Sequence, residues 1–310
     1  MSEANAPYTT LSKSVLLMGT VVSIRVVGDG RAHEMRKGID EAVAAMQGVE
    51  SMASRFDEDS VLCALCRQPG VLRPVPPALF YALAIAREMA ELTDGLFDPT
   101  VGGILESQGF DRHYLTGAKT HSDVAPDLSA SFRDITLVED GCQVRLEKPM
   151  LLDLGAVAKG LAVDLAVHSL ESFPGFMIDA GGDIYVSGVD PSGEPWHVGI
   201  EDPFHPERLL RLLSLTNLAV CTSGSYKRKS PKNPDQHHIV HPSSGESATG
   251  LVSLTAIGPQ TVLADAAATA AFLMGPDRAL PFIESLGLQG LCVTSQGHVL
   301  ETSPKEDSHD

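Results

Sequence analysis

An acid and an alcohol lie one helical turn apart near the C-terminal end of the chain. Asp265 and Thr269 are four residues apart in an alanine-rich segment, so on a helix they share one face. An ionised carboxylate among alanines is costly to bury unless it is paired or bound to a cation. Carboxylate and hydroxyl oxygens together suit Mg²⁺. The alternative is a helix-terminal charge at Asp265, with Thr269 bonded back to its own helix.

A second group of residues could hold a phosphate. The segment 152–160 (LDLGAVAKG) predicts a strand that ends in Asp153, a glycine turn, and a helix with Lys159 in its first turn. Helix N-termini present free N–H groups to phosphates, and Lys159 adds a positive charge there. Asp153 could accept hydrogen bonds from a ligand ring or hydroxyl. The alternative is a capped helix with a solvated lysine.

Two further segments could contribute to a site. His237, His238 and His241 lie within five residues, but their spacing is not that of a helical zinc pair, so a general base or an electrostatic role is the better interpretation. In the turn 93–100, Phe97 could stack on a flat ring and Asp98 could reach its polar edge; the alternative there is a capped turn with a core phenylalanine. Gly181-Gly182-Asp183 follows an apolar strand and is weak evidence alone.

Composition excludes several classes of function. The chain has 310 residues and a formal net charge of −17, which disfavours nucleic acid and anionic membranes as partners. No apolar run is long enough to form a transmembrane segment. The first residues contain no leader pattern, so we expect a cytoplasmic protein, or a periplasmic one if a leader was removed. The five cysteines do not form a disulfide pattern, and Cys63 and Cys66 are expected as small half-buried side chains on a helix.

The pattern of elements favours an α+β fold. We predict one strand over 15–27, helices over 31–53, 77–92, 156–171, 261–274 and 277–286, and a hairpin over 132–152. The predicted short strands cover 176–179, 184–188, 196–201, 209–215, 218–222, 251–257 and 290–300. No GxGxxG follows the first strand, which disfavours a dinucleotide-binding fold of the Rossmann type. Without a linker or repeat, residues 1–310 are expected to form a single domain, with an ordered core over 12–300 and a polar tail over 301–310.

Taken in order, these motifs resemble one family, the ApbE-type FAD:protein FMN transferases. The resemblance begins at Met18-Gly19-Thr20 and ends at Asp265 and Thr269, and it covers nearly the whole chain. Between them it includes the segments 54–60, 94–100, 153–160, 181–183, 222–224 and 238–242. His241 stands where the family has Asp or Asn, and Ala156-Val157 replaces Gly-Ile.

The resemblance implies a fold and a set of site residues. The fold would be a T-fold-like α+β core with an additional α/β subdomain. The carbonyl of Ala156 and the side chains of Asp265 and Thr269 would bind the metal, and His238 would be the essential catalytic histidine. The residues implied to contact the flavin are Met18, Phe56, Leu96, Phe97, Asp98, Asp153, Lys159 and Ile239.

The resemblance also implies a reaction. The expected substrate is FAD, the metal is Mg²⁺, and FMN is transferred to a Thr or Ser hydroxyl in an extended segment of an acceptor protein while AMP leaves. Two alternatives stay open at this stage: an FAD pyrophosphatase that uses water instead of the acceptor, and a non-catalytic flavin-binding module.

Overall fold

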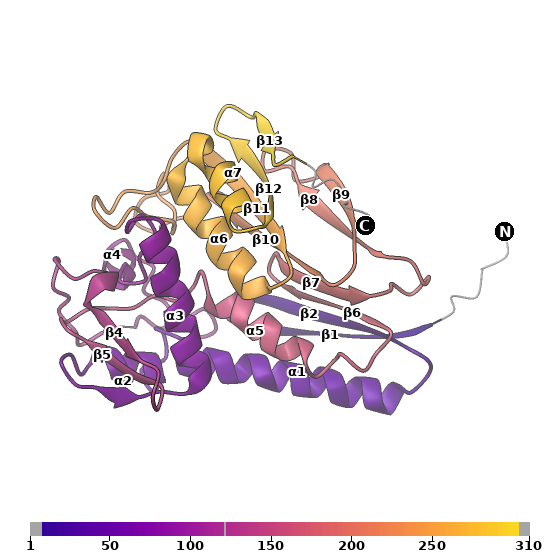
Figure 1. Cartoon of the computed structure of the whole chain (residues 1–310), viewed down its shortest axis with the longest axis horizontal. Coiled ribbons are helices and arrows are strands. Elements are labelled where there is room, and N and C mark those ends of the chain that lie inside the picture. Colours follow the sequence, from indigo (N-terminus) through magenta and orange to yellow (C-terminus); the bar gives the residue numbers. More distant parts are fainter. Residues whose placement is uncertain (1–7, 121, 304–310) are drawn as a thin grey trace.

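An eight-stranded antiparallel sheet forms the centre of the chain (Figure 1). The computed structural model describes residues 8–120 and 122–303. The strand order is β1-β2-β6-β7-β10-β11-β12-β13. The strands are β1 (Thr9–Leu17), β2 (Thr20–Gly28), β6 (Gly175–Ala180), β7 (Asp183–Gly188), β10 (Leu218–Gly224), β11 (Leu251–Gly258), β12 (Gln289–Thr294) and β13 (Val299–Glu301).

Helices cover one face of this sheet, as Figure 1 shows. They are α1 (Ala32–Ala53), α5 (Ala158–Val167), α6 (Thr261–Met274) and α7 (Pro276–Ser285). In α1 the buried positions Met35, Ile39, Met46 and Val49 recur at helical spacing, and this apolar stripe packs on α5 and the first strands. Helix α6 is buried on nearly all sides, which its alanines permit because they allow close approach of α5 and β10.

The hairpin of β8 (Trp196–Glu201) and β9 (Leu209–Leu215) packs on the other face. Trp196 is buried there against Val27, Val186 and Val220, and its indole N–H donates to the carbonyl of Ser187 at 2.9 Å. The middle of the central sheet is therefore covered on both faces, whereas the edge strands β1 and β13 are largely exposed.

A smaller α/β unit is inserted between α1 and α5 (Figure 1, lower left). It contains α2 (Val61–Cys66), α3 (Pro77–Leu92), α4 (Gly102–Ser107), the 3₁₀ helix η1 (Phe132–Asp134), and a sheet in the order β3-β5-β4. Its strands are β3 (Arg73–Pro74), β4 (Ile135–Val138) and β5 (Gln143–Leu146).

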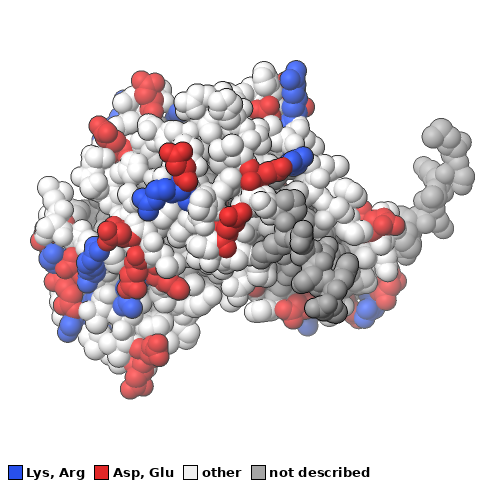
Figure 2. All heavy atoms as spheres, turned by 45° about the horizontal axis from the view of Figure 1, so that its top comes forward, with Lys and Arg blue, Asp and Glu red and all other residues white. Residues whose placement is uncertain are grey.

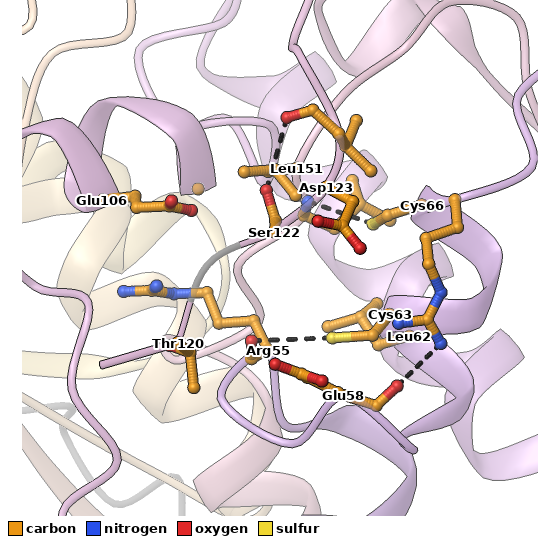
Figure 3. Close-up of a pocket in the computed structure, with 14 residues that line it drawn as sticks. Arg55, Glu58, Leu62, Cys63, Cys66, Glu106, Thr120, Ser122, Asp123 and Leu151 are labelled. Carbon is orange, nitrogen blue, oxygen red and sulfur yellow. Dashed lines mark hydrogen bonds between the residues drawn. The ribbon is translucent and has the colours of Figure 1, made fainter. Parts of the chain in front are cut away.

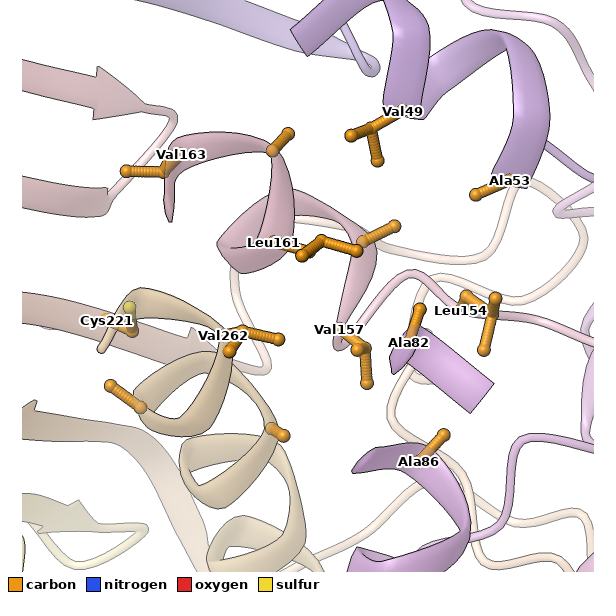
Figure 4. Close-up of a cluster of buried hydrophobic side chains, with 14 of the residues drawn as sticks. Val49, Ala53, Ala82, Ala86, Leu154, Val157, Leu161, Val163, Cys221 and Val262 are labelled. Atoms are coloured by element: carbon orange, nitrogen blue, oxygen red, sulfur yellow. The ribbon is translucent and has the colours of Figure 1, made fainter. Parts of the chain in front are cut away.

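The core is continuous between the two parts. Figure 4 shows Val49 of α1, Ala86 of α3, Leu161 of α5 and Val262 of α6 converging on one apolar cluster. Burial of each such side chain contributes on the order of 1–3 kcal/mol. This packing fixes the turn before α5, which carries Lys159, against α6.

The α+β prediction is confirmed, including the additional subdomain and the bounds of α3 and α6. The single strand predicted over 15–27 is wrong, because a turn at Met18 and Gly19 divides it into β1 and β2. Both residues have positive φ, 54° and 77°, as hairpin turns of type I′ require. β1 and β13 extend past both ends of the expected 12–300 core, and the predicted tail lies outside the described residues from 304 onward.

Charged side chains are interspersed over the surface. On the face that Figure 2 shows, acidic side chains are scattered and the basic ones lie mostly beside them, without a continuous basic patch among the coloured residues.

Candidate functional site

The turn before α5 places a lysine between two carboxylates. Lys159, the second residue of α5, forms ion pairs with Asp183 at the start of β7 and with Asp265 of α6, the latter at 3.2 Å. Lys159 is half-buried, whereas both carboxyl groups are nearly inaccessible. Asp183 was only a weak sequence signal, since nothing local indicates that it faces Lys159.

Helix α6 supplies the acid and the alcohol predicted from the sequence. Asp265 is its fifth residue, beyond the first turn, so the alternative of a helix-terminal charge does not describe it. Its Oδ2 accepts from the backbone N–H of Gly160 at 3.2 Å. Thr269 Oγ1 shares a 2.8 Å hydrogen bond with the hydroxyl of Ser223, instead of bonding back to its own helix.

Two further residues hold α5 and α6 together. A Cβ at Gly160 would lie 2.6 Å from the carbonyl oxygen of Thr261, so this position requires glycine. Asp164 of α5 accepts from the backbone N–H groups of Thr261 and Val262, at 2.8 and 2.9 Å. It thereby caps α6, for which no local side chain serves as a cap.

The charges of Lys159 and of the two carboxyl groups around it do not balance one another. Burial acts to lower the pKa of Lys159, but Asp183 and Asp265 outweigh it and raise that pKa above its ordinary value. Burial first, and then Asp183, raise the pKa of Asp265. Two buried carboxyl groups with one lysine leave a place for further positive charge.

The donor set fits a hard divalent cation. Among the described residues, Oδ1 of Asp265 and the carbonyl oxygen of Ala156 accept no hydrogen bond; the N–H of Gly160, which could bond to Ala156 in a regular first turn, bonds to Asp265 instead. Such orphan oxygens, together with the Thr269 hydroxyl, are the ligands that Mg²⁺ prefers. The residues predicted to bind the metal therefore suit that role.

A second cluster surrounds Asp153, at the start of the same turn. Its carboxylate pairs with Arg55 and also accepts from the N–H of Gly155 at 2.8 Å. Although burial acts in the opposite direction, Arg55 holds the pKa of Asp153 below its ordinary value. The Arg55 guanidinium lies 4.0 Å from the ring centroid of Phe56, and its Nη2 donates to the carbonyl of Phe110 at 2.7 Å.

The two adjacent histidines have different roles in the fold. His237 is buried; its Nε2 donates to the carbonyl of Ala248 at 2.9 Å, and its Nδ1 accepts from the N–H of Ile239 at 3.3 Å. Both ring nitrogens are therefore used by the fold. His238 is half-buried, and only its Nδ1 is bonded, at 3.4 Å from the carbonyl of Arg228. Burial, followed by the charge of Arg228, lowers the pKa of His238 to about 3, so the ring is neutral near pH 7.

The remaining residues predicted to contact the flavin are bonded or at least partly buried within the fold. Met18 sits in the β1–β2 turn, where its N–H donates to Glu50 at 2.7 Å. Leu96 is half-buried against the core, while Phe97 and Ile239 are fully buried. Asp98 is also buried, and its two oxygens accept from the N–H groups of Thr100 and Phe132 at 2.9 and 3.0 Å. These bonds match the capped turn considered from the sequence, and flavin contact by these residues stays a prediction.

A small pocket lies beside Arg55, on the subdomain side (Figure 3). It encloses about 40 Å³, room for about three water molecules and far below the size of a dinucleotide site. Cys63 and Cys66 of α2 line it: Cys63 donates to the carbonyl of Arg55 at 3.5 Å, and Cys66 accepts from the N–H of Leu152 at 3.5 Å. Burial raises the pKa of both thiols, that of Cys66 to about 12, which fits structural cysteines better than reactive ones.

A larger hollow of about 390 Å³ lies elsewhere, between the β8–β9 loop and the β12–β13 hairpin, and none of the predicted site residues lines it. None of the helices within 8–120 and 122–303 has the length and apolar character that a membrane crossing requires.

The site thus belongs to a class in which a helix-borne acid contacts a lysine-bearing helix N-terminus and has an alcohol one turn further along its own helix, an arrangement suited to a cation and a phosphate. The ApbE family model matches residues 18–292. The chain belongs to the ApbE family.

Named relatives agree with this assignment. A Treponema pallidum FAD:protein FMN transferase is 31% identical over 292 residues, which cover 86% of this chain and 79% of that protein. A Haemophilus influenzae protein of the same name is 27% identical, with 94% and 89% covered. The crystal structure of the ApbE protein from Thermotoga maritima superposes with a TM-score of 0.83 at 29% identity, covering 95% of this chain and 97% of that one. By this membership the chain is an enzyme of the flavin transferase class.

Proposed function

We propose that this chain transfers FMN from FAD to a Thr or Ser hydroxyl of an acceptor protein, releasing AMP, with Mg²⁺ as the cofactor. The names of its relatives support the transferase activity and its substrate. The observation that carries the metal and the phosphate chemistry is the junction of α5 and α6, where Asp265 contacts both Lys159 and the N–H of Gly160.

The metal would be held by Asp265, Thr269 and the carbonyl of Ala156. When bound, Mg²⁺ supplies charge stabilisation to the diphosphate oxygens and to the leaving AMP. The fit of the orphan oxygens supports these ligands, as described above. Thr269 could bind the metal through a lone pair of its oxygen while its hydroxyl proton is donated to Ser223.

The first turn of α5 would bind the phosphates. The ammonium group of Lys159, in the first turn of α5, presents positive charge there. Because Asp183 holds Lys159 as well, the ammonium group is kept in place before substrate arrives. Such preorganisation lets the site stabilise developing charge without first reorganising.

His238 is our candidate for accepting the proton of the acceptor hydroxyl. The carbonyl of Arg228 requires a donor at Nδ1, so the proton resides on Nδ1 and Nε2 keeps its lone pair. This tautomer supports proton acceptance over phosphate holding, for which Nε2 would need a proton. An incoming phosphate would raise the pKa of His238 from its low value and make it a better base.

The experiment is mass spectrometry of an acceptor protein with an exposed Thr or Ser segment, after incubation with the enzyme, FAD and Mg²⁺. We expect a mass gain of one FMN with the wild type, none with EDTA, and none with Asp265→Asn. Asp277→Asn is the matched control, because Asp277 is an exposed acid in the first turn of the neighbouring helix α7.

Three outcomes would contradict the proposal. Release of FMN and AMP at the same rate without acceptor indicates a pyrophosphatase. FAD that survives intact with Mg²⁺ and acceptor indicates a binding module. Full transfer by Asp265→Asn refutes the metal assignment.

A further inference from the structure

The cluster around Asp153 contains more positive than negative charge. The guanidinium groups of Arg55 and Arg228 both act on this single carboxylate and lower its pKa. Arg55 is fully engaged by Asp153, the carbonyl of Phe110 and the ring of Phe56. One carboxylate therefore lies near two arginines, and Arg55 is the one that forms an ion pair with it.

Arg228 is that second arginine, and it lies beside His238. Its guanidinium carbon is 5.8 Å from the ring centroid of Phe110, while its own carbonyl accepts from His238. Among the described residues its guanidinium forms neither a hydrogen bond nor an ion pair. Burial lowers the pKa of Arg228, Asp153 acts to raise it, and Arg55 acts to lower it. Arg228 is an exposed residue, so an incoming ligand can reach its guanidinium.

The neighbouring lysine behaves differently. Lys227 points to Glu201 at 3.6 Å and to the ring of Tyr226, so its charge is balanced away from the site. An anionic ligand would give the Arg228 guanidinium the charged partner that it lacks among the described residues. A planar guanidinium can donate two parallel hydrogen bonds to a phosphate, which makes it a specific phosphate ligand.

We propose that Arg228 binds a phosphate oxygen of the flavin dinucleotide next to His238, as a substrate-binding residue separate from the predicted metal ligands. The inference rests on the proposed function. Arg228 lies in the loop after strand β10. It would add a second cationic contact to the phosphates, besides the contact that Lys159 would provide from helix α5. Arg228 would then discriminate flavins that carry phosphate from riboflavin, which carries none.

The test is a titration monitored by flavin fluorescence, with EDTA present to prevent turnover. Riboflavin, FMN and FAD are titrated into the wild type, Arg228→Gln, Arg228→Lys and the control Lys227→Gln. We expect Arg228→Gln to weaken FAD binding on the order of tenfold or more, the loss of one charge-assisted contact. Arg228→Lys should lose less, and riboflavin binding should be the same in all four proteins.

The arms of the experiment distinguish the sources of the effect. Weaker binding of both FMN and FAD by Arg228→Gln assigns the flavin-side phosphate, and weaker binding of FAD alone assigns the adenosine-side phosphate; either supports the inference. Equal FAD affinity in Arg228→Gln and wild type overturns it, as does an equal loss for riboflavin. A wild-type chain that binds no FAD overturns the proposed function and this inference with it, which separates the two failures.

Discussion

Asp164→Ala should destabilise the fold through the start of α6. In the wild type, each oxygen of Asp164 accepts one backbone N–H, from Thr261 at 2.8 Å and from Val262 at 2.9 Å. Alanine would leave both N–H groups unbonded in a buried place. An unsatisfied buried donor costs about 1–3 kcal/mol, and loss of a helix cap costs about 0.5–2 kcal/mol.

The expected loss of stability is smaller than the sum of these two costs, because burying the Asp164 carboxylate is itself unfavourable. Burial raises the pKa of this carboxyl, so part of the hydrogen-bond energy is offset by desolvation. We therefore expect the free energy of unfolding to fall by about 2–3 kcal/mol at pH 7. For a chain of 310 residues this corresponds to a melting temperature lower by roughly 3–5 °C.

Urea titration followed by tryptophan fluorescence measures this loss. Trp196 is the only tryptophan and lies buried under the β8–β9 hairpin, in a different core cluster from α6. Asp277→Ala is the control, because it removes an exposed helix-terminal acid and should cost less than about 1 kcal/mol. A loss below about 0.5 kcal/mol for Asp164→Ala would refute the claim that this residue caps α6.

Three more predictions concern the same part of the chain. Asp183→Asn leaves Lys159 with only one ion-pair partner, the predicted metal ligand of α6. Calorimetry should therefore show Mg²⁺ binding weakened roughly tenfold. An unchanged Mg²⁺ affinity would exclude a role for Asp183 in metal binding. Burial lowers the pKa of His237 below its ordinary value. The unfolded chain therefore binds a proton at this residue more readily than the folded one, and the contribution of His237 to stability is lost as the pH falls below about 6.5. Urea midpoints between pH 7.5 and 5 should therefore fall less in His237→Asn than in the wild type, and parallel curves would count against the neutral buried ring. Gly160→Ala places a Cβ 2.6 Å from the α6 backbone and should lower the free energy of unfolding by about 1–3 kcal/mol in the same titration. Gly48→Ala is the control and should not destabilise the chain, because a Cβ at Gly48 meets nothing within 4 Å.

Much of the fold follows from local patterns. Helix α3 begins at Pro77 and α6 begins at Thr261 as predicted, because each has a strong apolar pattern and a proline marks the first turn of α3. The missed turn at Met18 and Gly19 interrupts a continuous β-branched run, and methionine gives no turn signal. Glycine at the second turn position was the only available indication.

The candidate site was predictable where its residues share one element. The four-residue spacing of Asp265 and Thr269 indicates a common face, and the glycine turn before Lys159 indicates a helix N-terminus. Asp183 and Asp164 could not be assigned in this way, since their partners lie far along the chain. Such partners depend on how helices and strands pack, which spacing alone does not determine.

The central claim is that one Mg²⁺ lies between α5 and α6, beside the diphosphate of bound FAD. A crystal structure of the chain with FAD and Mn²⁺, which gives an anomalous signal, tests it most directly. We predict one anomalous peak about 2.1 Å from a carboxylate oxygen of Asp265 and within bonding reach of Thr269 and the Ala156 carbonyl. FAD bound with its phosphates away from Lys159, or a peak that touches neither Asp265 nor Thr269, would contradict the account.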